Sequence, residues 1–119
     1  MSDRPIFWVG SSLEDIRDFP TTARQRAGFE LSLVQSGAMP SDWKAMPVVA
    51  AGVYEIRVHT EREIRVLYAA NFAEGVYVLH AFEKRSRRTR RHDIELARKR
   101  YGDVVRDRKS GSKSEEGSR

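Results

Sequence analysis

The sequence predicts an α+β domain in which one antiparallel sheet of about four strands carries its helices on one side. Three observations support this fold class. Residues 53–58 and 63–70 alternate apolar and polar side chains with the period of two that a half-buried strand shows. Residues 20–36 repeat apolar side chains at the spacings of three and four that are typical of a helix. The chain has 119 residues, which is the length of one domain.

The N-terminal elements are short. Residues 6–9 read Ile-Phe-Trp-Val and predict a short buried strand. Ser12, followed three residues later by Asp15, is typical of the N-cap of a short helix. A second helix is predicted to begin at Pro20 and to stop at Gly37, because proline suits the first helical turn and glycine suits a helix end.

Residues 36–52 contain two prolines and two glycines and predict a long connection. Trp43 in this connection is expected to be pinned against the core. Two hairpins then join three strands, 53–58, 63–70 and 76–82, through short polar linkers.

The third of these strands is apolar enough to be covered on both faces. Its period of two places Val76, Val78, His80 and Phe82 together on one face.

A last helix is predicted over residues 90–105, with apolar positions that include Ile94 and Tyr101. The remaining stretch is polar and low in apolar content. We therefore expect one folded domain over residues 1–107 and a disordered polar tail over residues 108–119.

The composition excludes several classes of protein. Cysteine is absent, which excludes a disulfide scaffold, a thiolate metal site and a thiol nucleophile. The three histidines show no ligand spacing, so we expect neither a metal nor any other cofactor. No apolar stretch is long enough to span a bilayer, and the N-terminus does not read as a secretory signal. The expectation is a soluble, cytoplasmic domain without a membrane partner.

The positive charge is concentrated in one segment. The formal net charge of the chain is +5, whereas residues 84–100 alone hold nine basic and two acidic side chains. Such a block is typical of a surface that binds a phosphate backbone or an acidic protein. The alternative is a solvated basic turn.

Two arginines fall on the polar faces of neighbouring strands. Arg57 and Arg65 are expected to lie close together if the hairpin pairs in register. Like charges side by side are tolerated when an anion lies between them, so the pair is a candidate phosphate site. The alternative pairs both arginines with nearby glutamates, Glu55, Glu61 or Glu63, as surface salt bridges.

His80 and Lys84 lie near the end of the last strand, where the basic segment begins. Histidine is the side chain best suited to move a proton near neutral pH. The alternative for His80, a histidine on a largely apolar strand face, is a hydrogen-bonded core residue.

Four blocks of the sequence together resemble the phage-derived HigB-like branch of the RelE/ParE toxin superfamily. They are Gly-Val-Tyr-Glu-Ile-Arg at 52–57, Arg-Val-Leu-Tyr at 65–68, Val-Tyr-Val-Leu-His-Ala-Phe-Glu-Lys-Arg-Ser at 76–86 and Asp-Ile-Glu-Leu-Ala-Arg at 93–98. The resemblance implies a small curved antiparallel sheet with helices against it. It also implies the toxin of a bacterial or phage toxin–antitoxin pair, which a cognate helix-turn-helix antitoxin silences.

RelE-type members of this superfamily cleave mRNA on the translating ribosome, so the resemblance implies an endoribonuclease with ribosome and mRNA as partners. Arg65 and Lys84 best match the basic residues of such a site, Arg57 matches the Tyr-Glu-x-Arg block, and His80 becomes an acid–base candidate. The catalytic tyrosine or histidine near the C-terminus of several relatives has no counterpart in this sequence. Arginines of the basic segment would contact RNA phosphates, namely Arg85, Arg87, Arg88, Arg90 and Arg91.

Two other functions remain open at this stage. One is a ParE-like toxin that binds DNA gyrase on the same fold without chemistry of its own. The other is a prophage accessory protein that binds nucleic acid and is not toxic. Fold alone does not choose among the three, because one fold serves many functions.

Overall fold

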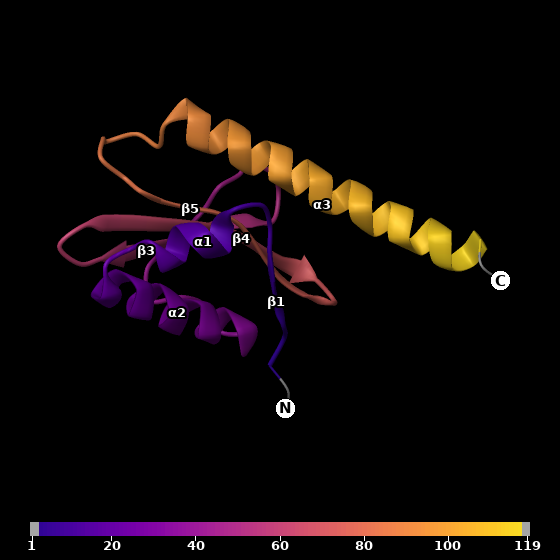
Figure 1. Cartoon of the computed structure of the whole chain (residues 1–119), viewed down its shortest axis with the longest axis horizontal. Coiled ribbons are helices and arrows are strands. Elements are labelled where there is room, and N and C mark those ends of the chain that lie inside the picture. Colours follow the sequence, from indigo (N-terminus) through magenta and orange to yellow (C-terminus); the bar gives the residue numbers. More distant parts are fainter. Residues whose placement is uncertain (1–2, 118–119) are drawn as a thin grey trace.

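The computed structural model describes residues 3–117 of the chain, with the side chains described as far as residue 110. Its elements follow the order that the sequence predicts, with one addition (Figure 1). They are β1 (Ile6–Trp8), α1 (Ser12–Arg17), α2 (Thr21–Gln35), β2 (Trp43–Ala45), β3 (Val53–His59), β4 (Glu63–Phe72), β5 (Gly75–Glu83) and α3 (Arg91–Gly117). The α+β class is confirmed.

The sheet is mixed and has five strands in the order β1-β5-β4-β3-β2. The strands β2, β3, β4 and β5 pair antiparallel in sequence order, whereas β1 pairs parallel to β5. The expectation of about four antiparallel strands is therefore corrected at both edges. The strand β2 has only three residues, all of them exposed, so the sequence carries no alternation that would reveal it.

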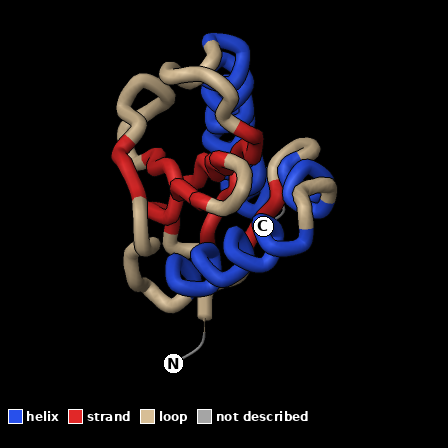
Figure 2. The backbone as a smooth tube through the Cα atoms, turned by 90° about the vertical axis from the view of Figure 1, so that its left-hand side faces the viewer, coloured by secondary structure: helices blue, strands red, loops and turns tan. Residues whose placement is uncertain are grey.

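The N-terminal helices α1 and α2 lie together on one face of the sheet, as expected, whereas α3 covers the other face, which corrects the expectation that all the helices lie on one side (Figure 1). On one face, Ile16 of α1 and Leu31 of α2 pack with strand residues such as Val66 in a first core. On the other face, Ala97 and Val104 of α3 pack with further strand residues in a second core. Figure 2 shows the strands gathered between the helices. The two cores share the same strands, so each helix depends on the sheet for its packing.

The strand β5 contains an irregularity that the sequence did not predict. Leu67 of β4 pairs with His80, and the next residue of β4 pairs with Val78, so Leu79 is an extra residue in β5. This bulge breaks the period of two. Val78 belongs to the first core, whereas Phe82, which stacks on His80, packs against the second. The prediction that all four alternating residues of this strand share a face is wrong for this reason.

Several local predictions meet the structure with small shifts. Gly37 follows α2 with a φ of +91°, a conformation that glycine adopts without strain, so the predicted stop is confirmed. The N-cap of α1 is Ser11 instead of Ser12. Trp43 is 42% exposed and packs edge-on against Tyr54, which corrects its expected burial.

The helix α3 continues to Gly117, beyond the end predicted near Val105. The boundary at residue 107 and the disordered tail over 108–119 stay predictions, and residues 118–119 lie outside the described residues. Within residues 3–117, no helix has the combination of length and apolar character that a membrane span requires.

Candidate functional site

A basic cavity of about 440 Å³ opens on the α3 side of the sheet, between the edge strand β2, the loop after β5 and the start of α3. Its apolar wall comes from the β2–β3 connection and from Ile94 of α3. Its basic side chains come from three separate parts of the chain, namely Lys44, Arg57, Lys84, Arg87 and Arg88. Glu55 is the one acidic residue among the described residues that line it. We call this space the first cavity.

Arg57 and Arg65 are direct cross-strand partners in β3 and β4, as the hairpin register predicts. The anion between them is the carboxylate of Glu55. The Nε of Arg57 lies 3.2 Å and the Nε of Arg65 lies 3.7 Å from the same oxygen, Oε1 of Glu55. The salt-bridge alternative therefore describes the resting arrangement, with Glu63 as a further partner 3.2 Å from Arg65.

These two arginines differ in exposure. The side chain of Arg65 is 7% exposed and does not line the first cavity, whereas that of Arg57 is 32% exposed and does. Arg65 therefore balances the charge of Glu55 from 3.7 Å, with an Nε that has no hydrogen-bond partner among the described residues. Arg57 donates a hydrogen bond to Glu55 and is also placed to reach a ligand.

The sequence indicates Glu55 only as a possible salt-bridge partner of Arg57 and Arg65, not as a site residue. Its side chain is 2% exposed, and its Oε2 has no hydrogen-bond partner among the described residues. A buried carboxylate oxygen without a donor is costly, so it is a natural acceptor for a proton or hydroxyl group from a ligand. Its place in the sequence, on the same strand face as Arg57, was the pattern that could have indicated it.

His80 lies under the start of α3 instead of in the first cavity. Its Nε2 lies 2.7 Å from Oδ1 of Asp93, and its ring stacks on Phe82 with centroids 4.9 Å apart. Its Nδ1 is buried and has no hydrogen-bond partner within the described part of the chain. The imidazole thus links β5 to α3. Ile94, the residue after Asp93, lines the first cavity, so this contact fixes one wall of the site.

A second contact holds α3 against the bulge. Arg100 donates a hydrogen bond from Nη1 to the carbonyl of Leu79, at 2.9 Å, and another from Nη2 to the Ser11 hydroxyl, at 3.0 Å. A Cβ on Gly10 would lie 2.7 Å from this guanidinium, and Gly10 has a φ of +57°. Glycine is favoured there because it adopts a positive φ without strain, and a side chain at this position would displace the guanidinium of Arg100.

The predicted RNA-binding arginines divide between two spaces. Arg87 and Arg88 line the first cavity, and Arg88 also lines a neighbouring cavity together with Arg90 and Arg91. Arg85 lines neither of these cavities and contacts Glu83 at 3.4 Å. The structure therefore brings four of the five arginines to a shared surface.

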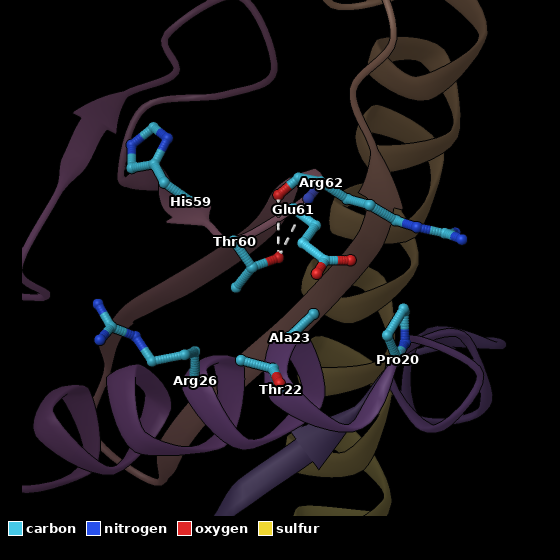
Figure 3. A pocket seen from close by; sticks show the side chains of 8 residues that line it. All are labelled: Pro20, Thr22, Ala23, Arg26, His59, Thr60, Glu61 and Arg62. Carbon is cyan, nitrogen blue, oxygen red and sulfur yellow. Dashed lines mark hydrogen bonds between the residues drawn. The ribbon is translucent and has the colours of Figure 1, made fainter.

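A separate cavity of about 300 Å³ lies between the start of α2 and the β3–β4 turn, and none of the predicted site residues lines it (Figure 3). Arg26 points from α2 towards His59, and Thr60 hydrogen-bonds to the backbone of Arg62. His59 lies between Asp42 and Glu63, at 2.6 and 2.7 Å, and the hydrogen bond that its ring donates to Asp42 raises the pKa of His59. Among the described residues that line this cavity, no buried side-chain polar atom lacks a hydrogen-bond partner.

In the part of the chain that the structure describes, no cluster of three or more histidine, aspartate or glutamate side chains is arranged to hold a metal ion. The chemistry that the first cavity offers is that of fixed cations around one carboxylate. Such an arrangement suits a ligand that carries both a phosphate and a hydroxyl group.

The fold and the site define a class: a small α+β protein with a mixed sheet between helices and a basic cavity at one end of that sheet. A family model described as "Phage derived protein Gp49-like (DUF891)" matches residues 14–102. The chain belongs to this phage-derived family, which is associated with RelE-like and other toxin-like proteins. The match runs from α1 into α3 and includes every predicted site residue. No curated protein matches the chain.

Proposed function

We propose that the chain is the HigB-like toxin of a type II toxin–antitoxin pair and that it cleaves mRNA on the translating ribosome. The observation that carries this proposal is the first cavity, where five basic side chains share a wall with Glu55, whose buried Oε2 has no hydrogen-bond partner among the described residues. The family supports the toxin part of the proposal, and the chemistry of the cavity supports the ribonuclease part.

RNA can be cleaved when its ribose 2′-oxygen attacks the neighbouring phosphorus and the bond from phosphorus to the 5′-oxygen breaks. The products are a 2′,3′-cyclic phosphate and a free 5′-hydroxyl group. In this cavity Glu55 accepts the proton of the 2′-hydroxyl, and Lys84 gives a proton to the leaving 5′-oxygen. Arg57 and Lys84 stabilise the charge that develops on the phosphorane. Arg65 acts through Glu55 as a positioning residue.

His80 has a different role from the one suggested by its chemistry alone. Because it is buried and bonded to Asp93, it keeps α3 in place beside the cavity. The proposal also includes a cytoplasmic location, where ribosomes are found, and a cognate helix-turn-helix antitoxin that silences the toxin.

The test is primer extension across reporter mRNAs after brief induction in bacteria, with four variants beside the wild type. Lys84→Ala and Glu55→Gln remove proposed chemistry, and Arg65→Ala removes the support of Glu55. Arg24→Ala is the matched control, because Arg24 is an exposed arginine on α2, which packs on the opposite face of the sheet. Circular dichroism of each purified variant separates loss of chemistry from loss of fold.

The wild type and Arg24→Ala are expected to cut within translated regions, whereas Lys84→Ala and Glu55→Gln are expected to leave the same messages whole. Growth arrest with intact mRNA would overturn the proposal in favour of a toxin with a protein target such as DNA gyrase. Normal growth with intact mRNA would favour a nucleic-acid-binding accessory protein.

A further inference from the structure

A second basic cavity of about 520 Å³ adjoins the first, on the far side of a shared wall. Four residues line both spaces, namely Val48, Arg88, Thr89 and Ile94. The two spaces therefore form one trough that runs from the end of the sheet across the start of α3.

The shared wall is held in place by a long-range contact. Arg98 of α3 donates a hydrogen bond from its Nε to the backbone carbonyl of Val48, at 2.7 Å. This bond ties the β2–β3 connection to α3. Val48 is nevertheless 44% exposed, so an apolar surface faces the trough instead of the core.

The second cavity offers its own sites for a phosphate. Arg90 and Arg91 line it at the point where α3 begins, and the free backbone N–H groups of a helix start favour an anion. Arg91 pairs with Glu95 at 2.8 Å, but its side chain is 92% exposed. Such a surface pair is worth little, so a phosphate can replace the carboxylate.

We propose that the first cavity holds the scissile phosphate and that the second cavity binds the body of one of the two nucleotides that this phosphate joins, on a single strand of RNA. Its phosphate contacts Arg90 and Arg91, and its base packs on Val48 and Ile94. The guanidinium plane of Arg88, on the shared wall, stacks against a base between the two spaces. This inference rests on the proposed function and adds to it the place where the second nucleotide beside the scissile phosphate binds.

Single-stranded RNA fits the trough better than a duplex does. An apolar wall and a guanidinium plane recognise the face of a base, and that face is stacked away inside a double helix. The arginines at the start of α3 supply the phosphate contacts that make such binding depend on salt.

The experiment is a two-dimensional ¹H–¹⁵N NMR titration of the protein with RNA of one, two and four nucleotides. The RNA carries 2′-O-methyl groups, which block attack by the 2′-oxygen and so permit binding without cleavage. The mononucleotide is expected to shift amide signals around the first cavity. The dinucleotide is expected to shift the signals of Ser86, Arg91 and Glu95 as well, which line only the second cavity, and to bind about tenfold more tightly.

The variant Arg90→Ala should weaken dinucleotide binding about fivefold and leave mononucleotide binding within twofold of wild type. It should also make the slope of log K against log salt shallower by about 0.7, because one RNA phosphate is no longer neutralised. The matched control is Arg106→Ala, an exposed arginine further along the same helix that lines neither cavity. This variant is expected to bind like the wild type.

Three results would overturn the inference: dinucleotide shifts confined to the first cavity, an equal effect of Arg90→Ala and Arg106→Ala, or no binding of any RNA to the wild type. The proposed function is judged separately, by mRNA cleavage in cells. If the protein binds the dinucleotide as described but leaves mRNA whole, the inferred RNA-binding site stands and the proposed ribonuclease activity does not.

Discussion

At the scale of single residues, the central feature is one buried carboxylate shared by two arginines. Glu55 is 2% exposed and Arg65 is 7% exposed, so neither charge is well hydrated. Removing one partner of such a pair leaves the other charge buried and poorly compensated, although Glu63 still contacts Arg65. The ion pair is therefore expected to affect stability as well as the proposed chemistry.

We expect Glu55→Ala and Arg65→Ala each to lower the free energy of unfolding by about 3–5 kcal/mol. The loss of unfolding free energy in the double variant should be about 1–3 kcal/mol smaller than the sum of the two single losses, because the first substitution already breaks the ion pair. Urea unfolding measures all four proteins. A matched double-mutant cycle with Glu55→Ala and Arg57→Ala should give a smaller coupling energy than the cycle with Arg65→Ala, since Arg57 is 32% exposed and its charge is better hydrated. Purely additive losses for Glu55 and Arg65 would contradict this account.

A second residue-scale prediction concerns Glu74 and Arg108, far from the cavity. The hydrogen bond from Arg108, with Nη2 3.1 Å from Oε1, lowers the pKa of Glu74 from 4.5 to about 2. A lowered pKa stabilises the fold above pH 4.5, and this contribution is lost as the pH falls towards 2.

NMR titration of the Glu74 carboxyl group measures this pKa directly. Arg108→Ala is expected to move the pKa back towards 4.5, and 1 M salt should move it part of the way, because the pair is near the surface. A Glu74 carboxyl group that titrates alike with and without Arg108 would show that the pair does not form in solution.

At the scale of elements, periodicity predicted what depends on local patterns. The strands β3, β4 and β5 and the helix α2 lie within a few residues of their predicted ranges because each one shows a regular apolar face. The parallel pairing of β1 with β5 joins residues seventy positions apart, such as Ile6 and Val76. The three residues of β1 are too few to show a period. The bulge at Leu79 is one inserted residue, which alternation alone cannot reveal.

The end of α3 provides the element-scale prediction. Val104 and Val105 are the last apolar residues of α3 in the second core, and Arg108 lies over the ring of Phe72 at the edge of that core, 4.3 Å from its centroid. Residues 110–119 contain no apolar side chain. A helix without packing is marginal in water. Deleting residues 110–119 is therefore expected to change the free energy of unfolding by less than about 0.5 kcal/mol.

Hydrogen exchange on the full chain tests the same point, with fast exchange expected after residue 109 and protection around Ala97. The truncated chain is compared with the full chain in urea unfolding. A clear loss of stability on truncation would mean that the tail packs on the domain. The folded domain would then extend beyond residue 107, and the predicted boundary would be wrong.

At the scale of the whole molecule, the site is assembled from parts that are distant in sequence. The basic segment and the Arg57–Arg65 pair were predictable, because charge density and strand register are local properties. The contact of His80 with Asp93 depends on the bulge, and the wall at Val48 depends on Arg98. Neither follows from a local pattern, so the sequence indicated the charges of the site but not its shape.

The same arrangement predicts how the molecule unfolds. In the strand β4, Val66 and Tyr68 face the first core, and Leu67 and Ala69 face the second. A loss in either core therefore weakens a strand that both cores need. Unfolding is expected to be a single transition, as for most small domains.

Leu31→Ala empties a fully buried position in the first core and should cost about 2–5 kcal/mol. Val104→Ala removes a buried side chain from the second core and should lower the free energy of unfolding by less, because fewer carbon atoms are removed. Tryptophan fluorescence, to which Trp8 beside the first core contributes, and the far-ultraviolet circular dichroism of the helices are followed in urea. The urea concentration at the midpoint of unfolding should fall by the same amount in both signals for each variant. If Val104→Ala moved only the circular dichroism, α3 would be leaving the sheet on its own, and the first cavity would lose a wall before the domain unfolds.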